Sequence, residues 1–329
     1  MPRRVLFRTE GGRVPEIGTG HIFRSLRLAD ALATDCDIVF VSCAGAKFRF
    51  GHAQVRQHGY PLFLLPQAGS LNTLQSVVKR CSPDFVICDQ YHYAAEELRI
   101  FRDSGAPVMT FDLPGAYRRY ADYPIDTVAS PAGGRFAGPK YAVIPPPRRG
   151  RFRRTPGRIF VCFGGFDYSG LTMMVSRTLA RLPISQRVDV IVSRCYPDLA
   201  RLRRAIGAAD TRVTVHVQPD DFAELLAASD IAVVSGGVTM FQALSVGTSV
   251  MVVSQYAHQR DIVRRFSRSG AFIDLGPAKR LTHGKIDRTL TALLSDHARR
   301  RTLRRNAMAL VDGRGLERVS RLVRAALNA

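Results

Sequence analysis

Two segments of the sequence combine residue types that can move a proton. His21 follows the glycine-rich residues 17–20 and precedes a stretch with helical periodicity. At the N-terminus of a helix the dipole disfavours the imidazolium, so a neutral imidazole there can accept a proton. Asp89 and Tyr91 follow an apolar run, and Asp112 follows the next one, which predicts that they leave the carboxyl edge of a sheet. These residues predict an acid–base or hydroxyl-binding site; the alternative is that they only cap turns.

Glycine-rich turns between a strand and a helix recur in the second half of the chain. Such turns let a ligand approach the backbone, and they aim the first N–H groups of the helix at an anion. One turn contains Gly164, Gly165 and Asp167, with Ser169 expected as the helix cap. The other is Gly236-Gly237-Val238-Thr239. Both are predicted to face a diphosphate, although each alone is a common kind of turn.

Polar residues near these turns extend the predicted ligand site. Gln242 lies one turn inside the helix that follows Thr239, within reach of a ribose hydroxyl. His258 and Gln259 open another helix after an apolar strand. The alternatives are an exposed helix residue for Gln242 and ordinary capping for His258 and Gln259.

Short apolar runs alternate with amphipathic stretches along the chain, which predicts parallel strands connected by helices. The predicted strands cover residues 5–7, 38–41, 61–65, 85–88, 108–111, 158–163, 188–192, 213–217, 231–234 and 249–253. The predicted helices cover residues 22–32, 71–78, 94–101, 171–182, 199–206, 222–228, 240–246, 258–267, 286–294 and 299–327.

The alternation is interrupted once, by Pro145-Pro146-Pro147 and the Arg-, Pro- and Gly-rich residues 148–157. We expect a solvated basic linker over 148–157, between an N-terminal domain over residues 1–147 and a C-terminal domain with a helical tail over residues 158–329. Two successive α/β units predict two Rossmann-like domains facing across a cleft. Ligands of open α/β sheets bind beyond the carboxyl ends of the strands.

The composition indicates a folded protein. The 329 residues are 46% hydrophobic and 23% charged, which is typical of globular domains. No apolar run approaches the roughly 18–20 residues of a membrane span, and the apolar part of the N-terminus is too short for a signal peptide. We therefore expect a cytoplasmic protein.

The charge balance is strongly basic, with 48 Lys and Arg against 27 Asp and Glu and a net charge of +21. The sequence contains no zinc-finger spacing and no RNP-like aromatic motif, so nucleic acid is not expected as a partner. A phosphorylated small molecule, or peripheral association with an anionic membrane through the Arg-rich surface, is preferred.

The six cysteines form no CxxC pair and no zinc-ligand spacing. They are interpreted as reduced, buried thiols, and no metal site is predicted.

Taken together, the motifs resemble one family: the UDP-2,4-diacetamido-2,4,6-trideoxy-β-L-altropyranose hydrolases of pseudaminic acid biosynthesis, with their spore-coat-polysaccharide relatives. The resemblance extends from about Val5 to Gly276 and is specific as an ensemble. It rests on Ile17-Gly18-Thr19-Gly20-His21 with Arg24, Asp89-Gln90-Tyr91, Gly138-Pro139-Lys140-Tyr141, Gly164-Gly165-Phe166-Asp167, Ser235-Gly236-Gly237-Val238-Thr239 and His258-Gln259.

The resemblance implies a GT-B fold and a nucleotide sugar as substrate, with the sugar and the chemistry on the N-terminal domain and UDP mainly on the C-terminal domain. It implies that His21 is the active-site base near the anomeric carbon, with Asp89 and Tyr91 as catalytic partners. It implies no metal or other cofactor, because backbone amides would neutralise the diphosphate. The substrate-binding residues would be Gly18, Gly20, Arg24, Gly164, Gly165, Asp167, Gly236, Gly237, Val238, Thr239, Gln242, His258 and Gln259.

The sequence departs from the family in several places. The segment 9–16 before the glycines is longer than usual, and Gly164-Gly165-Phe166-Asp167 stands for a Gly-Gly-Ser-Asp pattern. Gln242 stands where the family has a glutamate that grips the ribose, and Asp89-Gln90-Tyr91 stands for an Asp-His-Tyr-like triplet. Hydrolysis of a UDP-activated (di)acetamido-deoxy sugar is the preferred interpretation. One alternative is a GT-B glycosyltransferase that moves the sugar to an acceptor hydroxyl, since the turn at residues 235–239 resembles that of the enzyme that adds N-acetylglucosamine in lipid II synthesis. The other alternative is a degenerate member that only binds nucleotide sugars.

Overall fold

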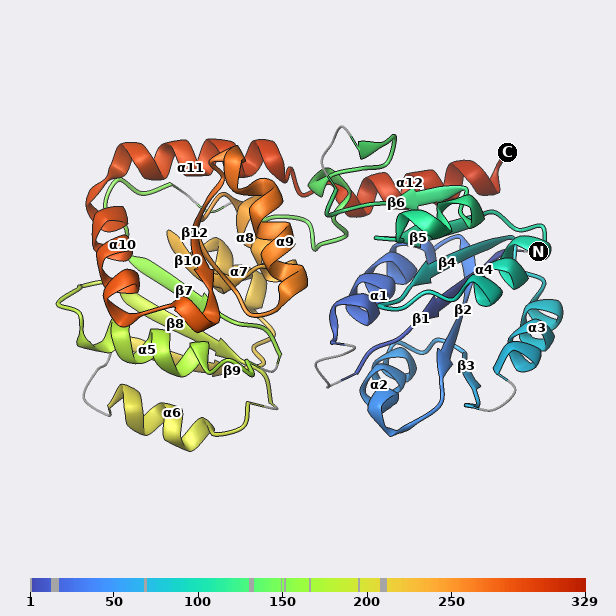
Figure 1. The fold of residues 1–329 in the computed structure, drawn as a ribbon, viewed down its shortest axis with the longest axis horizontal. Helices are drawn as coiled ribbons and strands as arrows, with labels where there is room; N and C mark the ends of the chain where they lie inside the picture. Colours follow the sequence, from blue (N-terminus) through green and yellow to red (C-terminus); the bar gives the residue numbers. More distant parts are fainter. Residues whose placement is uncertain are drawn as a thin grey trace. The chain divides into compact units, whose positions relative to one another are not determined.

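The computed structural model describes residues 2–12, 18–67, 70–129, 133–148, 150, 152–165, 167–194, 196–207 and 212–329. The chain forms two compact units, one of Met1–Ile144 with Arg314–Ala329 and one of Pro145–Gly313 (Figure 1). Each unit contains a six-stranded parallel sheet.

The first unit has the strand order β3-β2-β1-β4-β5-β6. Its strands are β1 (Arg3–Thr9), β2 (Cys36–Cys43), β3 (Leu62–Leu65), β4 (Phe85–Asp89), β5 (Val108–Phe111) and β6 (Tyr123–Ile125). Its helices are α1 (Gly20–Leu32), α2 (Arg49–Gln57), α3 (Ser70–Cys81), α4 (Ala95–Asp103) and α12 (Gly315–Leu327). The order reverses between β1 and β4, and this switch point is where open α/β sheets bind their ligands.

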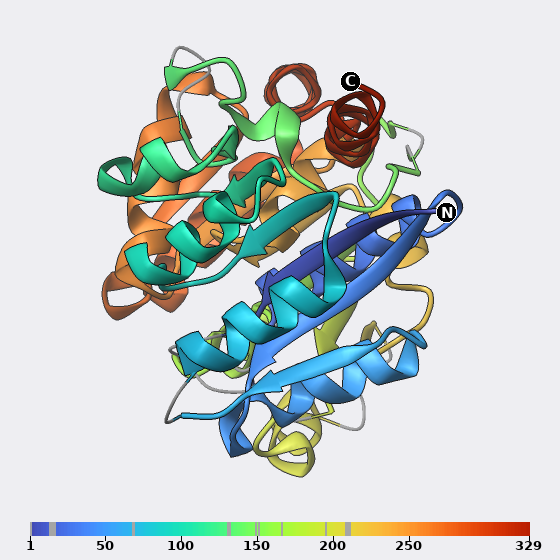
Figure 2. The ribbon, with the colours of Figure 1, turned by 90° about the vertical axis from the view of Figure 1, so that its right-hand side faces the viewer.

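Helices cover both faces of the first sheet, because successive side chains of a strand point to opposite sides. Phe7 packs on the side of α1 and α12, where Val323 is fully buried. Leu6 packs on the other side, against Leu98 of α4. Figure 2 looks onto the face that α3 and α4 cover.

The second unit repeats the pattern, with the strand order β12-β11-β10-β7-β8-β9. Its strands are β7 (Arg158–Cys162), β8 (Arg187–Val192), β9 (Val213–Val217), β10 (Ile231–Ser235), β11 (Ser249–Ser254) and β12 (Phe272–Pro277). Its helices are α5 (Leu171–Arg181), α6 (Leu199–Ile206), α7 (Phe222–Ala227), α8 (Val238–Val246), α9 (Ala257–Phe266), α10 (His283–Ser295) and α11 (His297–Leu310). Here the switch point lies between β7 and β10.

The sequence predicts most of these elements to within a few residues, and the two-domain Rossmann-like architecture is confirmed. It misses α2, β6 and β12. The predicted single helix over residues 299–327 is wrong, because α11 ends at Leu310 and α12 begins at Gly315. Between them Gly313 has φ +76°, and a Cβ there would lie 2.4 Å from Pro147 Cγ, so this break needs glycine.

The division of the chain differs from the predicted ranges at the tail. Residues 314–329 belong to the first unit rather than to the domain predicted over 158–329. The physical reason is the apolar face of α12, on which Val319 and Val323 are fully buried in the first core. Arg324 adds an ion pair, with Nε 2.8 Å from Asp35 Oδ2.

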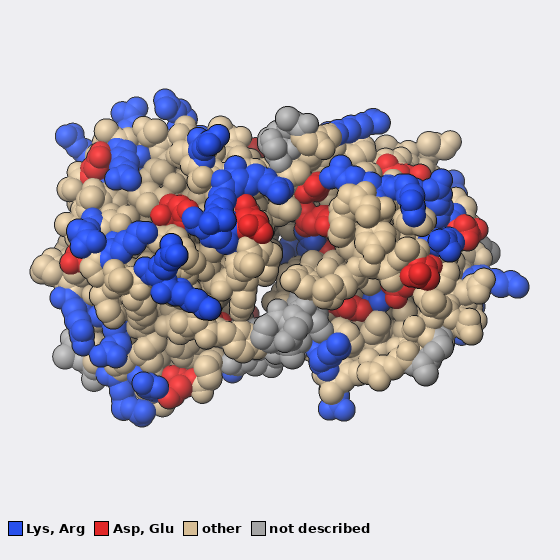
Figure 3. Space-filling model, viewed as in Figure 1, with Lys and Arg blue, Asp and Glu red and all other residues tan. Residues whose placement is uncertain are grey.

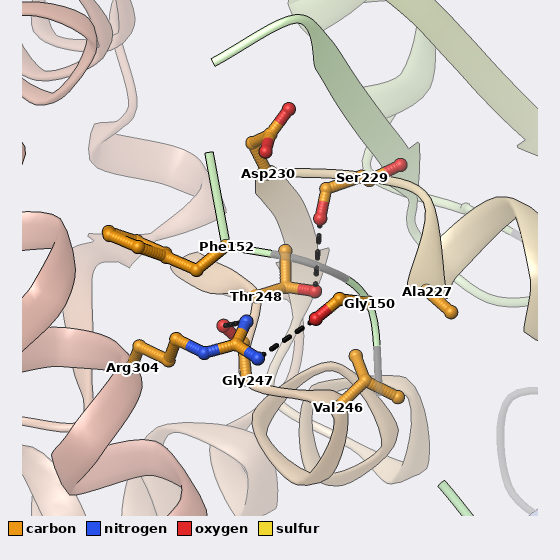
Figure 4. Close-up of a pocket in the computed structure, with 9 residues that line it drawn as sticks. All are labelled: Gly150, Phe152, Ala227, Ser229, Asp230, Val246, Gly247, Thr248 and Arg304. Atoms are coloured by element: carbon orange, nitrogen blue, oxygen red, sulfur yellow. Dashed lines mark hydrogen bonds between the residues drawn. The ribbon is translucent and has the colours of Figure 1, made fainter. Parts of the chain in front are cut away.

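The described part of residues 148–157, predicted as a solvated linker, is hydrogen-bonded to the second unit. Arg304 of α11 donates to Gly150 O at 2.9 Å and to Gly247 O at 3.1 Å (Figure 4). Arg300 donates to Arg154 O at 2.5 Å. A Cβ on Gly150 would lie 1.8 Å from Ala227 O, so the backbones touch at this point.

Basic side chains are spread widely over the surface, as the face drawn in Figure 3 shows. Within the described parts of the chain, no helix is both long enough and apolar enough to cross a lipid bilayer. The described cysteines are all free thiols; Cys36, Cys81, Cys88 and Cys162 are buried and Cys43 is half-buried. Cys195 lies outside the described residues.

Candidate active site

An aspartate and a histidine meet at the switch point of the first sheet. Asp89 is the last residue of β4, opposite Thr9 of β1, and His21 lies in the first turn of α1. The two side chains are hydrogen-bonded, with His21 Nδ1 2.7 Å from Asp89 Oδ1. The Asp89 side chain is fully buried, whereas that of His21 keeps 21% of its surface exposed.

The ionisation of Asp89 fixes the tautomer of His21. Burial by itself would raise the pKa of Asp89, but Arg24 and His21 outweigh it and lower that pKa to about 2. An ionised carboxylate only accepts hydrogen bonds, so Nδ1 of His21 must be the donor. Neutral His21 therefore keeps a lone pair on Nε2, and its half-exposed ring can take a proton from a ligand.

Arg24 lies one helical turn after His21 and bonds two carboxylates. Its Nε and Nη2 lie 2.6 Å from Asp89 Oδ2 and Oδ1, respectively, and its Nη1 lies 2.7 Å from Asp112 Oδ2. The guanidinium carbon stands 4.4 Å from the centre of the Phe111 ring. Arg24 was predicted to bind substrate, but these contacts direct its guanidinium into the protein.

Asp112 is held from its other side by the segment after β6. Its Oδ1 accepts hydrogen bonds from the backbone N and from Oγ1 of Thr127, both at 2.8 Å. Its backbone has φ +51°, an uncommon value for a residue other than glycine. No pattern in the sequence predicts Thr127 as a residue of this site.

Aromatic residues border the Asp89–His21 pair. The exposed ring of Tyr91 stands edge-on to His21, with the centroids 6.3 Å apart. The Tyr93 hydroxyl lies 3.0 Å from Cys88 O and 2.6 Å from Phe111 O, so it joins the ends of β4 and β5. Before the helix, Gly18 has φ +65°, a left-handed turn that favours glycine.

A second polar cluster lies on the opposite face of the same sheet. Arg8 is buried and bonds both oxygens of Glu97 at 3.1 Å. Gln90 donates to Glu97 Oε2 at 3.2 Å, so it points away from His21. The sequence signal for this cluster is Arg8 itself, which directly follows the apolar residues 5–7 of β1 and was not among the predicted site residues.

In the second unit, the turn after β10 has the predicted form. Helix α8 begins at Val238, and no side chain caps its N-terminus. A Cβ on Gly236 would lie 2.7 Å from Val263 Cγ2, so the turn packs against α9 too closely for a side chain. Cys162 of β7 pairs with Val234 of β10, so the ends of these two strands lie side by side.

The residues that follow β11 separate into buried and exposed positions. Gln259 is buried, and its Oε1 accepts from Gln255 N at 2.9 Å. Its Nε2 then lies beside the turn, 3.8 Å from where a Cβ of Gly237 would be. His258 is exposed and its ring is stacked on that of Tyr256. Gln242 is half-buried on α8.

The turn after β7 corrects one prediction. Ser169 does not cap α5; the carboxylate of Asp167 accepts from Leu171 N at 2.9 Å and from Thr172 N at 2.6 Å. Burial raises the pKa of Asp167 despite these bonds. Asp167 thus occupies the helix start that was predicted for a diphosphate. Gly164 has φ +82°. The motif residues Ile17 and Phe166 lie outside the described residues.

Across the described ranges, no group of three or more His, Cys, Asp or Glu side chains is arranged to hold a metal ion. The absence of a metal requirement stays a prediction, and the chelator experiment below tests it.

No protein-family model matches the chain. Over 326 residues it is 23% identical to the spore coat polysaccharide biosynthesis protein SpsG of Bacillus subtilis, with 94% of each chain covered. Over 287 residues it is 21% identical to the UDP-2,4-diacetamido-2,4,6-trideoxy-beta-L-altropyranose hydrolase of Campylobacter jejuni, covering 81% of this chain and 97% of that one.

Solved structures share the whole fold. MurG of Acinetobacter baumannii matches with a TM-score of 0.76 and 15% identity, covering 98% of this chain and all of that one. The calicheamicin glycosyltransferase CalG4 matches with a TM-score of 0.71 and 15% identity, covering 99% and 98%. The chain therefore has the GT-B fold, with two Rossmann-like units, and is similar over most of its length to a spore coat polysaccharide protein and a UDP-sugar hydrolase.

Proposed function

We propose that the protein hydrolyses a UDP-activated (di)acetamido-deoxy sugar at its anomeric carbon, releasing the free sugar and UDP. The observation that carries the proposal is the Asp89–His21 hydrogen bond of 2.7 Å, which leaves Nε2 of a partly exposed histidine as a proton acceptor. Similarity to the hydrolase of Campylobacter jejuni supports the choice of substrate class.

In the proposed reaction, a water molecule gives a proton to Nε2 of His21 while its oxygen attacks the anomeric carbon. The bond from that carbon to the diphosphate oxygen breaks, and UDP leaves with the electron pair. Asp89 stabilises the imidazolium that forms, since it stays ionised and accepts the Nδ1 proton in a hydrogen bond. His21 then returns its proton to solvent. Tyr91 borders His21 with an exposed ring and is proposed to contact the sugar.

The nucleotide is proposed to bind the second unit at Gly236, Gly237, Val238 and Thr239. The uncapped N-terminus of α8 supports this, because its first N–H groups and the helix dipole favour a diphosphate. Gln259 Nε2 beside Gly237 adds a donor. Gln242 stays the proposed ribose contact. Asp167 is a weaker candidate, because its oxygens cap α5.

A glycosyltransferase is the second candidate, because the same base would deprotonate an acceptor hydroxyl. It is favoured by 29% identity over 192 residues to an N-acetylglucosamine transferase of Chromobacterium violaceum, which covers 56% of this chain and 49% of that one. That relative is a UDP-N-acetylglucosamine--N-acetylmuramyl-(pentapeptide) pyrophosphoryl-undecaprenol N-acetylglucosamine transferase.

The test is product analysis with a panel of UDP-amino sugars, pure protein, EDTA and no acceptor. Hydrolysis predicts stoichiometric UDP and free sugar, with one solvent oxygen in the sugar when the water is labelled with oxygen-18. If UDP is released only when an acceptor lipid or glycan is added, the protein is a transferase and not a hydrolase. Loss of release with EDTA, restored by a divalent cation, would contradict the metal-free mechanism.

A further inference from the structure

We propose that Asp112 is a positioning residue for the base His21 and that it acts through Arg24. The inference rests on the proposed role of His21. Asp112 makes no described contact with His21, and Oδ1 and Oδ2 both have partners inside the protein. It therefore acts on the pair that carries the chemistry rather than on the substrate.

The first step of the argument is the geometry of Arg24. Arginine has a planar fork of N–H donors on a long side chain with many rotamers. Here the fork bonds Asp89 through two nitrogens at 2.6 Å, and the third nitrogen bonds Asp112 at 2.7 Å. The same Nη2 lies 3.4 Å from Nδ1 of His21. Fixing the far end of the fork thus fixes the carboxylate oxygen that orients His21.

The second step is that Asp112 is itself rigidly held. Thr127 donates twice to Oδ1, and Asp112 N donates to Ile125 O at 2.8 Å. The left-handed backbone at Asp112, with φ +51°, is a strained conformation. Strain of this kind persists where surrounding contacts over-determine it, and it clusters at functional sites. Asp112 therefore anchors Arg24 to the end of the sheet.

The third step is the charge of the cluster. Arg24 carries one positive charge, and Asp89 and Asp112 carry one negative charge each, so the cluster has a net charge of −1 while His21 is neutral. A proton on His21 brings the net charge to zero. With Asp89 alone, Arg24 would already be balanced. Asp112, held against Arg24 by their ion pair, offsets the charge of Arg24 and leaves that of Asp89 for the protonated histidine of the transition state. Losing the bridge between the two carboxylates removes this contribution as well, so the charge effect also passes through Arg24.

The test compares Asp112→Asn with Asp84→Asn. Asparagine tolerates the left-handed backbone and keeps an oxygen for Thr127, but it removes the charge facing Arg24. Asp84 is a matched control, because it accepts from a backbone N–H (Arg4) at 2.7 Å and from an arginine (Arg3) at 2.9 Å, and its side chain is 31% exposed against 24% for Asp112. It lies before β4, at the other end of that strand from Asp89.

We expect Asp112→Asn to lower kcat for UDP-sugar hydrolysis about 10- to 100-fold, with KM and UDP affinity changed less than about threefold. Asp84→Asn keeps the kcat of the wild type. A kcat for Asp112→Asn equal to that of Asp84→Asn overturns the inference. So does a change in KM alone, because that would make Asp112 a substrate contact.

A double-mutant cycle tests the route through Arg24. Arg24→Lys keeps the charge, but an ammonium does not bridge two carboxylates in a planar fork. If Asp112 acts through Arg24, the double variant has the kcat of Arg24→Lys alone within about twofold. Multiplying losses overturn the inference. Thermal unfolding shows whether each variant of the cycle is folded. If Asp112→Asn does not fold, Thr127→Val replaces it, and a smaller loss of kcat is expected. An unchanged kcat for Thr127→Val would overturn the inference.

The failure of this inference is distinguishable from that of the proposed function. If His21→Ala abolishes hydrolysis while Asp112→Asn does not change kcat, only the positioning role fails. If His21→Ala leaves hydrolysis intact, the proposed base itself is wrong.

Discussion

Asp89 keeps its charge inside the protein because Arg24 and His21 contact both of its oxygens. A buried carboxylate without such partners would be costly and would take up a proton instead. The same bonds orient His21, so the contacts that keep Asp89 ionised also set the position of the proposed base. The single residue on which the proposed chemistry depends most, besides His21, is therefore Asp89.

Replacing Asp89 by asparagine is expected to lower kcat about 1,000- to 10,000-fold. An asparagine amide at this position can turn a donor toward Nδ1 and so stabilise the wrong tautomer of His21. Steady-state hydrolysis of the UDP-sugar measures the loss, and Asp84→Asn serves again as the control. A kcat within about threefold of the wild type would show that His21 does not need Asp89.

The pKa of Asp89 also predicts how stability depends on pH. An aspartate in an unfolded chain has a pKa of about 3.9, whereas that of folded Asp89 is about 2. The folded state thus favours the ionised form, and the stabilisation is complete above about pH 4 and is lost as the pH falls toward about 2.

Urea unfolding of the wild type and of Asp89→Asn between about pH 7 and about pH 3 checks this sign. The wild type should lose more free energy of unfolding than the variant over that range. Parallel pH dependences would contradict the low pKa of Asp89.

The positions of Asp89 and Asp112 after two apolar runs were enough to predict that both leave one edge of the sheet, because the carboxyl ends of parallel strands meet there. The grouping of Asp89 and Tyr91 with His21 came from the family resemblance. The bonds from Arg24 to Asp112 and from Asp112 to Thr127 were not predictable, since they join residues far apart in the sequence. The cap of α5 was misassigned to Ser169 because Asp167 reaches forward over four residues.

At the scale of elements, the final helix shows why sequence order is a poor guide to domain membership. Helix α12 follows α11 directly, yet Val319, Val323 and Leu327 are buried in the first unit. The periodicity of the tail predicted its helices, but not the break at Gly313, which depends on contact with Pro147. The short strand β6 was missed because three residues with a central Pro124 do not form a recognisable run.

Val323→Ala is expected to lower the free energy of unfolding by up to about 3 kcal/mol, because it truncates a fully buried side chain of α12. Arg321→Ala, on the exposed side of the same helix, is expected to change the free energy of unfolding by less than about 0.5 kcal/mol. Denaturant unfolding measures both. Equal effects of the two substitutions would mean that α12 does not contribute to the first core.

At the scale of the whole molecule, the net charge of +21 has no counterpart in the proposed chemistry. Some arginines are structural: Arg24, Arg300 and Arg304 donate to groups inside their own units. Many other basic side chains face solvent (Figure 3). An anionic membrane surface attracts such charges by roughly 1 kcal/mol for each Lys or Arg near it.

We therefore expect the protein to sediment with vesicles that contain phosphatidylglycerol but not with vesicles of phosphatidylcholine alone. Binding should fall between about 0.05 M and about 0.5 M salt, since the Debye length shortens over that range. Equal binding to both kinds of vesicle, or no binding at low salt, would contradict a peripheral electrostatic association.

The central claim is that His21 is the base of a nucleotide-sugar enzyme whose second unit binds the nucleotide. The most direct measurement compares the wild type and His21→Ala for turnover of a UDP-amino sugar and, by calorimetry, for UDP affinity. We expect kcat to fall at least about 100-fold with UDP affinity unchanged within about twofold. Turnover that survives the substitution, or an equal loss of turnover and UDP binding, would contradict the claim.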